Sequence, residues 1–470
     1  MNGKFQTKID ILNYLSALDW LVFSLVILAT IGAVFYGNSL KKKNSNEEES
    51  FVDLMLMGRS LTLPMFIATL VATWYGGIFG VSQIAFENGI YNFVTQGFFW
   101  YMAYIVFAFF ITKRLAGFKA MTLPDLAGQM FGPKSAKLVG VLNVLNLVPV
   151  VYAISIGLLI QMLLGYPLEL SIVVGVIFVL GYSLFGGFRA VVFSDLIQFF
   201  VMCLAVILTL VFSIEQFGLV KLNILPESYF KPMGKYGILE TLSWGLIAVS
   251  TLVDPNFYQR SFAANSFQTA KKGILISTVI WIVFDLSLTF GAMYAKAVIP
   301  EADSSHAYFI YALQLLPEGL RGLFLAGIAA TILSTLDSYI FLAGSTIAYD
   351  LVPKEWKGKV GIHHLGVISV GIVSILMATI FEGNIKAVWK TLGSLSSAAL
   401  LLPVLYGYLF PKRLKDMQFI IASIAGVIVT FIWRLGGYKY TYNLDEIYMG
   451  SLACLVALFI FHFKTKKEEA

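Results

Sequence analysis

Four aspartates lie deep in apolar stretches of this sequence, where an ionised side chain is costly and therefore informative. They are Asp195, Asp254, Asp285 and Asp337. Asp195 follows a tight Gly-Gly turn and opens a predicted helix, so it either caps that helix or performs a function. Asp285 is either a protonated, hydrogen-bonded structural acid or a site for a proton or a cationic substrate.

The residues around Asp337 offer oxygen ligands on one face of a predicted helix. Ser334 and Ser338 are four residues apart and share a helix face, with Thr335 beside them. Hydroxyl, carbonyl and carboxylate oxygens suit a hard cation, and Na⁺ is the economical candidate. Such hydroxyls can instead bond back to their own helix, but the nearby aspartate favours an ion site.

The composition places these residues in a membrane. Of the 470 residues, 58% are hydrophobic and 13% are charged, whereas soluble domains carry about 25% charged residues. A soluble enzyme, a disulfide-rich secreted module and a disordered chain are excluded. A bilayer core requires about 20 apolar residues per helix. We find thirteen such runs, at 17–37, 63–86, 92–112, 137–164, 168–186, 190–213, 239–256, 273–298, 319–349, 365–382, 387–410, 417–435 and 446–463.

Basic residues in the loops predict the orientation. Most of the 33 lysines and arginines fall in alternate loops, such as Lys41–Lys43, Lys113–Lys137 and Arg260–Lys272. The positive-inside rule then puts the N-terminus outside and the C-terminus in the cytoplasm. The first run is a retained anchor helix, because a basic stop-transfer segment follows it. We expect a multi-pass protein of the plasma membrane, or of the inner membrane in a Gram-negative cell.

No pattern in the sequence indicates an enzyme, an organic cofactor or a nucleic-acid partner. Three of the four histidines lie outside the apolar runs, His462 lies at the end of the last one, and no Cys/His cluster is present. The net charge of +6 is scattered over short loops that lack interleaved aromatic residues. The expected partners are therefore the lipid bilayer and small solutes.

Two of the predicted spans contain breaks. Ala72–Gly77 places a glycine pair in mid-membrane, and Asp254 precedes a proline that should stop a helix. Transporters bind ions and substrates where helices unwind near the midplane. In a core of two five-helix halves, 63–213 and 239–410, each break falls in the first helix of its half. For the glycine pair alone, close helix packing is the alternative explanation.

The stretch Gly186–Gln198 resembles the signature of the sodium/solute symporter family, which includes sodium–glucose, proline, pantothenate, sialic acid and choline transporters. Gly58–Leu61 and the Ser334-Thr335 pair are similar too, and the resemblance covers most of 17–435. It implies an all-α, LeuT-like 5+5 inverted-repeat bundle with one extra N-terminal helix and two extra C-terminal helices, about 13 transmembrane helices in total. It also implies import of a small organic solute, driven by Na⁺, through alternating access.

The implied organisation has five parts. They are an anchor helix and cytoplasmic linker (1–62), a first repeat (63–213), an extracellular loop (214–238), a second repeat (239–410), and C-terminal helices with a short cytoplasmic tail (411–470).

The resemblance also implies ligand sets for the coupling ion. The first sodium site would use the carbonyls of Ala72, Tyr75 and Thr331 and the hydroxyls of Ser334 and Thr335. A second sodium site, found in only some members, would use Asp195, Ser334, Asp337 and Ser338. Asp337 stands where some relatives have serine, so it could tighten that site or carry a proton.

The substrate is less determined. Ile78 and Phe79 follow the first break where sugar-transporting relatives have polar side chains, which disfavours a hexose. Trp74 could hold a quaternary ammonium by a cation–π interaction or could simply pack, and Asp254 could pair with an amine. An organic cation or an amino acid is favoured. The predicted substrate-binding residues are Trp74, Gly76, Gly77, Gln96, Asp254, Asn256, Phe257 and Tyr258.

Two alternatives remain open. One is a proton-coupled transporter of the same fold, with Asp337, Asp285 or Asp195 as the proton carrier. The other is a membrane sensor or a membrane-embedded enzyme that does not transport. It is disfavoured because we expect no output domain after the last span, and the histidine and cysteine positions form no catalytic set.

Overall fold

The computed structural model describes residues 5–8, 10–40, 47–115, 117–184 and 187–469, with the backbone alone at 47–50 and 464–469. The chain is helical in these parts, apart from an isolated bridge between Leu61 and Ala264. Lys41–Lys43 and Gly186, which supported the predicted orientation and the family resemblance, lie outside the described residues.

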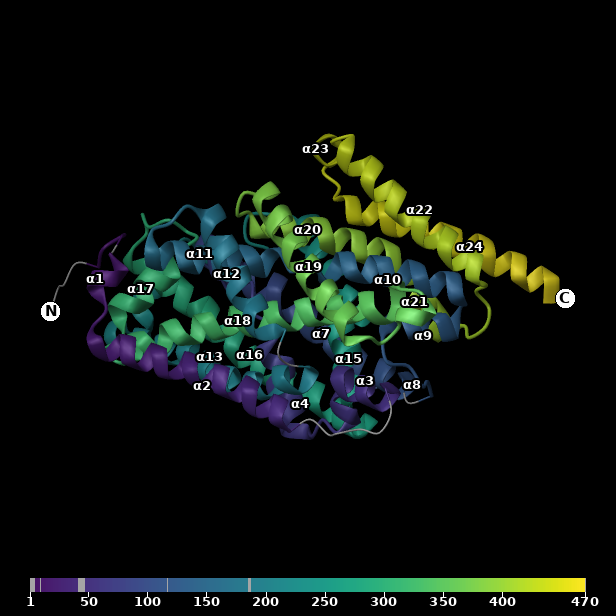
Figure 1. Ribbon diagram of the computed structural model, residues 1–470. Helices are drawn as coiled ribbons and strands as arrows, with labels where there is room; N and C mark the ends of the chain where they lie inside the picture. The colour runs from purple at the N-terminus through teal and green to yellow at the C-terminus, as the bar shows by residue number, and fades with distance from the viewer. Residues whose placement is uncertain (1–4, 9, 41–46, 116, 185–186, 470) are drawn as a thin grey trace.

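The described helices form a polytopic bundle in which long helices run side by side (Figure 1). Eleven helical segments of this part of the chain are long and apolar enough to cross a membrane. They are α2 (Ala17–Ser39), α6 to α8 (Tyr91–Leu115), α10 with α11 (Pro133–Leu164), α13 (Phe188–Phe217), α14 with α15 (Gly237–Ala263), α16 (Phe267–Val298), α18 with η7 (Leu320–Leu351), α19 (Val360–Ile380), α20 with α21 (Ile385–Leu409), α22 (Asp416–Leu435) and the apolar part of α24 (Glu446–Phe463).

Two shorter apolar helices are α4 (Leu63–Ala72) and α12 (Leu168–Ser183). The predicted apolar runs fall on these helices, which confirms the all-α membrane fold; the total of thirteen spans stays a prediction.

Both predicted breaks are confirmed. The first run is divided into α4, which ends at Ala72, and α5 (Ile78–Asn88). The second is divided into α14 (Gly237–Val249), a short 3₁₀ turn η6 (Ser250–Val253) and α15 (Pro255–Ala263). Asp254 adopts an extended conformation and caps α15, because its Oδ1 accepts a hydrogen bond from the amide of Asn256 at 2.8 Å.

A third interruption was not predicted. The run 137–164 consists of α10 (Pro133–Leu147) and α11 (Val150–Leu164), joined at Val148 and Pro149. Proline has no amide hydrogen to continue the helical ladder, so the helix ends before it and restarts after it.

Helix α18 forms the centre of the bundle. Every residue from Phe324 to Thr346 is buried, and the helix contacts α2, α4, α10, α11, α12, α13 and α19. Polar residues of this helix must therefore find partners inside the protein.

The N-terminal helix α2 is joined to the start of α18 by one buried carboxylate. Asp19 forms a capping box with Ser16, and its Oδ1 accepts hydrogen bonds from the amides of Gly319 at 2.7 Å and Gly322 at 3.1 Å. A Cβ atom at position 322 would lie 2.0 Å from the Asp19 carbonyl oxygen. Only glycine therefore permits this approach of the two backbones.

Gly322→Ala should separate α2 from α18 and lower the free energy of unfolding by about 1–3 kcal/mol, the usual cost of overpacking. Thermal unfolding of the detergent-solubilised protein measures this loss. Gly32→Ala is the matched control in α2, because nothing lies within 4 Å of a Cβ at that position. Equal effects of the two substitutions would contradict the proposed role of the contact.

Candidate functional site

The end of α4 and the middle of α18 bring oxygen atoms together. Because α4 stops at Ala72, the carbonyl of that residue has no helical amide partner. The Ser334 hydroxyl lies 2.7 Å from this carbonyl and 2.7 Å from the Ala330 carbonyl. The Thr335 hydroxyl lies 3.5 Å from the Ala72 carbonyl and 2.8 Å from the Thr331 carbonyl.

This arrangement fits a monovalent cation. Each hydroxyl can donate its hydrogen to a carbonyl of its own helix, to Ala330 or Thr331, and turn its lone pairs toward the break. The oxygens of Ala72, Ser334 and Thr335 then converge without a formal charge, which is a suitable ligand set for Na⁺. The structure thus places four of the five residues predicted for the first sodium site together.

The fifth residue, Tyr75, lies within the same break. Its ring stacks on Phe284 with the centroids 4.1 Å apart. The neighbouring Gly76 is pressed against α18, since a Cβ there would lie 2.5 Å from the Cβ of Thr335. Glycine at this position lets the unwound backbone approach the hydroxyl pair.

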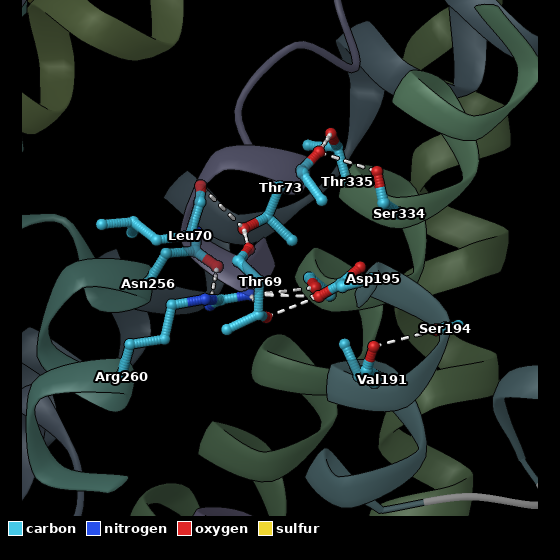
Figure 2. A network of polar contacts seen from close by, with 12 residues as sticks. Thr69, Leu70, Thr73, Val191, Ser194, Asp195, Asn256, Arg260, Ser334 and Thr335 are labelled. Carbon is cyan, nitrogen blue, oxygen red and sulfur yellow. Dashed lines mark hydrogen bonds and ion pairs between the residues drawn. The ribbon is translucent and has the colours of Figure 1, made fainter. Parts of the chain in front are cut away.

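A fully buried arginine, Arg260 of α15, lies beside these residues (Figure 2). Its Nη2 donates to the Thr69 hydroxyl at 3.1 Å and to the Ser338 hydroxyl at 3.3 Å, and lies 3.9 Å from Asp195 Oδ2. Its Nη1 donates to Asn256 Oδ1 at 3.2 Å, and the Thr69 hydroxyl donates to Asp195 Oδ2 at 2.5 Å. The network joins α4, α13, α15 and α18.

The prediction that Arg260 belongs to a cytoplasmic loop is wrong. The residue lies within α15, the second part of the second broken helix, and most side chains of α15 are buried. Arg260 was grouped with Lys271 and Lys272, because basic residues near the end of an apolar run usually mark a loop. Its three polar partners on other elements, Thr69, Asp195 and Ser338, could not be recognised from the local sequence.

The four side chains predicted for the second sodium site each bond elsewhere. Asp195 and Ser338 both contact Arg260, and the Ser334 hydroxyl lies 2.7 Å from the carbonyls of Ala72 and Ala330. Asp337 accepts a short hydrogen bond from Ser183 of α12. Arg260 supplies a positive charge at this location, and the second sodium site stays a prediction.

A cavity of about 150 Å³ lies between the two helix breaks. Trp74 and Tyr75 enter it from the first break, and Asp254 enters it from the second. Asp254 is the charged residue among the described residues that line it. The other lining residues are Val81, Gln96, Trp100, Asn146, Val148, Pro149, Val150, Val151, Tyr152, Trp244, Ile247, Tyr339, Val388, Trp389, Leu392 and Gly393.

Three of the predicted substrate-binding residues, Trp74, Gln96 and Asp254, line this cavity. Gly76 and Gly77 support its wall instead of lining it. A Cβ at Gly77 would lie 2.3 Å from the Trp389 ring, so glycine lets that tryptophan close over the break.

The other three predicted residues lie behind the wall. Phe257 packs edge-on against Trp74, with the ring centroids 5.8 Å apart. The Tyr258 hydroxyl donates to the Leu252 carbonyl at 2.9 Å, and Asn256 holds Arg260. These residues position the second break and do not contact the cavity.

Most of the tryptophans that line the cavity were not predicted from the sequence. Four of the eight tryptophans of the chain line the cavity, namely Trp74, Trp100, Trp244 and Trp389. Outside a helix break, a tryptophan in an apolar run looks like a packing residue. The enrichment becomes visible only when α7 (Phe99–Val106), α14 and α20 (Ile385–Ser396) are brought together.

Comparisons with known proteins agree on one group of transporters. The family model described as "Sodium:solute symporter family" matches residues 54–426. The chain is 25% identical to an osmoregulated proline transporter of Bacillus subtilis, over 74% of this chain and 75% of that one. It is 24% identical to a sodium/glucose cotransporter of Vibrio parahaemolyticus, over 78% and 74%, and 25% identical to a sodium/proline symporter of Staphylococcus aureus, over 95% and 92%.

The fold also has a solved counterpart. A Na⁺-coupled sialic acid symporter in a substrate-bound outward-open state superposes with a TM-score of 0.74, covering 94% of this chain and 96% of that one at 16% identity. This likeness establishes the LeuT-like fold.

The pair of Asp195 and Arg260 should be strongly coupled in the free energy of unfolding. Asp195→Asn or Arg260→Met leaves one buried charge unpaired, and each should destabilise the protein by about 3–5 kcal/mol. The double variant should lose less free energy of unfolding than the sum of the losses in the two single variants. Thermal or denaturant unfolding in detergent micelles measures the stability of the wild type, the two single variants and the double variant.

The exposed pair of Lys231 and Glu227, 3.0 Å apart, is the control for this cycle. Its coupling energy should stay below about 1 kcal/mol. Additive effects of Asp195→Asn and Arg260→Met would show that the two groups do not stabilise each other.

Proposed function

The chain belongs to the sodium:solute symporter family, so it is a transporter and not an enzyme, and we propose that it imports a small organic cation together with Na⁺. One observation carries the proposal. A small cavity between the two helix breaks has four tryptophans and a single carboxylate, Asp254, in its described lining.

The sodium site is proposed at the oxygens of Ala72, Thr331, Ser334 and Thr335, with Tyr75 from the same break. An ion bound there would hold the unwound segment of the first broken helix against α18. The same segment contributes Trp74 and Tyr75 to the cavity. Because one conformation of the segment serves both ligands, Na⁺ and the solute stabilise the same state, which is the requirement for coupling.

The charge of the lining indicates the charge of the solute. Tryptophan faces attract cations by about 0.5–2 kcal/mol, and Asp254 offers a full negative charge to an ammonium group. No lysine or arginine lies among the described lining residues to pair with an anion. A neutral sugar would leave the negative charge of Asp254 without a partner, whereas an ammonium group would pair with it. An amino acid is the second candidate, since the relatives include proline transporters.

The proposal includes the organisation and orientation predicted from the sequence. The corresponding positions of the two breaks support repeats at 63–213 and 239–410, and the distribution of basic loops supports an outside N-terminus and a cytoplasmic C-terminus. Import into the cell would then use the inward Na⁺ gradient across the plasma membrane.

Ser334→Ala combined with Thr335→Ala should abolish Na⁺-stimulated uptake or raise the half-saturating Na⁺ concentration at least about tenfold, because two ion ligands are lost. Uptake into proteoliposomes at limiting Na⁺ measures this effect. A Na⁺ gradient and a pH gradient, imposed separately, distinguish sodium coupling from proton coupling.

Ser374→Ala combined with Thr379→Ala is the matched control. These two hydroxyls of α19 donate only to carbonyls of their own helix, at 2.7 Å each. Wild-type Na⁺ dependence in the Ser334/Thr335 variant would overturn the sodium assignment.

Asp254→Asn should weaken binding of an organic cation at least about thirtyfold, since truncating one partner of a buried charge pair costs about 2–5 kcal/mol. Thermal-shift measurements with primary amines, quaternary ammonium ions, amino acids, carboxylates and sugars, each with and without Na⁺, identify the class. Asp303→Asn, in the loop before α17 (Ala307–Leu315), is the control, because its carboxylate pairs with His306 away from the cavity. Stabilisation by sugars alone, unaffected by Asp254→Asn, would refute a cationic solute.

A further inference from the structure

A second carboxylate lies one side chain away from the cavity. Asp285 stands in the middle of α16 and is 1% exposed. Its Oδ2 accepts a short hydrogen bond from the Tyr101 hydroxyl, while its Oδ1 has no hydrogen-bond partner. Among the described residues, no lysine, arginine or histidine forms an ion pair with Asp285.

Of the other three buried aspartates, Asp337 accepts a hydrogen bond from Ser183 away from the described lining of the cavity, and the remaining two are already engaged. Asp195 has Arg260 and Thr69, and Asp254 has the amide of Asn256 as well as the open cavity. Asp285 has neither a cation nor a backbone amide. A buried carboxylate in this situation has a large unmet capacity to bind a positive group.

Asp285 and Asp254 both lie near one aromatic cluster, which is centred on Tyr104. Tyr104 interacts electrostatically with both carboxylates. Its ring lies 4.5 Å from that of Trp281 and 5.4 Å from that of Trp74, measured between centroids. The Tyr104 hydroxyl and the Trp281 indole nitrogen are buried without hydrogen-bond partners. Aromatic faces between two negative groups suit an apolar chain with a cation at each end.

A π-helical segment, η2 (Val94–Phe98), contributes residues both to the cavity lining and to the surroundings of Asp285. Such segments are frequent at functional sites. Gln96 lines the cavity, and its amide nitrogen is buried without a partner. At the adjacent Gly97, a Cβ would lie 3.3 Å from Asp285 Oδ2. Gln96 and Gly97, two adjacent residues of η2, therefore connect the cavity lining to the neighbourhood of Asp285.

We propose that the solute is a linear diamine, with one ammonium group on Asp254 and the other on Asp285. This inference rests on the proposed function and restricts the solute from organic cations in general to linear diamines. Asp254 recognises the first cation, and Asp285 is the residue that distinguishes a diamine from a monoamine. The aromatic cluster around Tyr104 would contact the methylene chain.

Binding of α,ω-diaminoalkanes of three to six carbons, compared with n-alkylamines of equal length, tests the proposal. Calorimetry or thermal shift of the purified full chain in nanodiscs with Na⁺ measures the affinities. The wild type should bind one diamine at least about tenfold more tightly than the monoamine of equal length, the effect of a second close charge pair. Asp285→Asn should remove this preference, so that the diamine binds no more tightly than the monoamine of equal length.

Asp285→Glu provides a second readout that does not depend on loss of the charge. The added methylene moves the carboxylate toward the solute, so the preferred diamine should become about one carbon shorter. Asp303→Asn should keep the wild-type preference, and Asp254→Asn should weaken monoamines and diamines alike.

The outcomes separate this inference from the proposed function. Na⁺-dependent binding of monoamines without any preference for diamines would overturn the role of Asp285 and leave the cation symporter intact. A diamine preference that survives Asp285→Asn would do the same. Binding of no amine at all would reject both the diamine and the organic cation.

Discussion

The guanidinium of Arg260 holds the central helices of this bundle in register. It is fully buried, and its partners Asp195, Thr69 and Ser338 come from three other helices. A buried charge is tolerated only when its partners are positioned well, so the packing of α4, α13, α15 and α18 is constrained by this one side chain. Ser338 is one helical turn from Ser334, which ties the ion pair to the proposed sodium site.

The two helix breaks leave backbone groups free inside the bundle, where a regular helix would have none. An unbroken helix satisfies all its carbonyls internally, whereas α4 ends at Ala72 and leaves an acceptor facing Ser334. Glycines at 76 and 77 let the unwound backbone lie against Thr335 and Trp389, so the ion ligands and the cavity wall share the same few residues. A rigid side-chain site would lack this mechanical connection, because the connection depends on a segment that has no helical hydrogen bonds of its own.

Local pattern predicted the parts of the structure that depend on local chemistry. The lengths of the apolar runs predict the helices. Asp254-Pro255 and the glycine pair predict the two breaks. The spacing of Ser334, Thr335 and Ser338 predicts that they share one face of a helix. The contacts between side chains of different helices could not be predicted in this way. Phe257 and Tyr258 follow a break just as Trp74 precedes one, and only the packing of neighbouring helices decides which aromatic ring reaches the cavity. Arg260 shows the same limit, since its partners come from distant parts of the chain.

The balance of charge in the bundle explains why cations should be its ligands. Arg260 lies 3.9 Å from Asp195, whereas among the described residues Asp285 and Asp337 bond to hydroxyl groups and form no ion pair. Ionising all four carboxylates with one guanidinium would leave a negative interior at low dielectric, which is unfavourable unless further positive charge enters. The proposed sodium ligands are themselves neutral, so the ion gains its attraction from these surrounding carboxylates and not from direct contact. Sodium and a cationic solute can then bind together although they repel each other, because each compensates a different part of the same excess of negative charge.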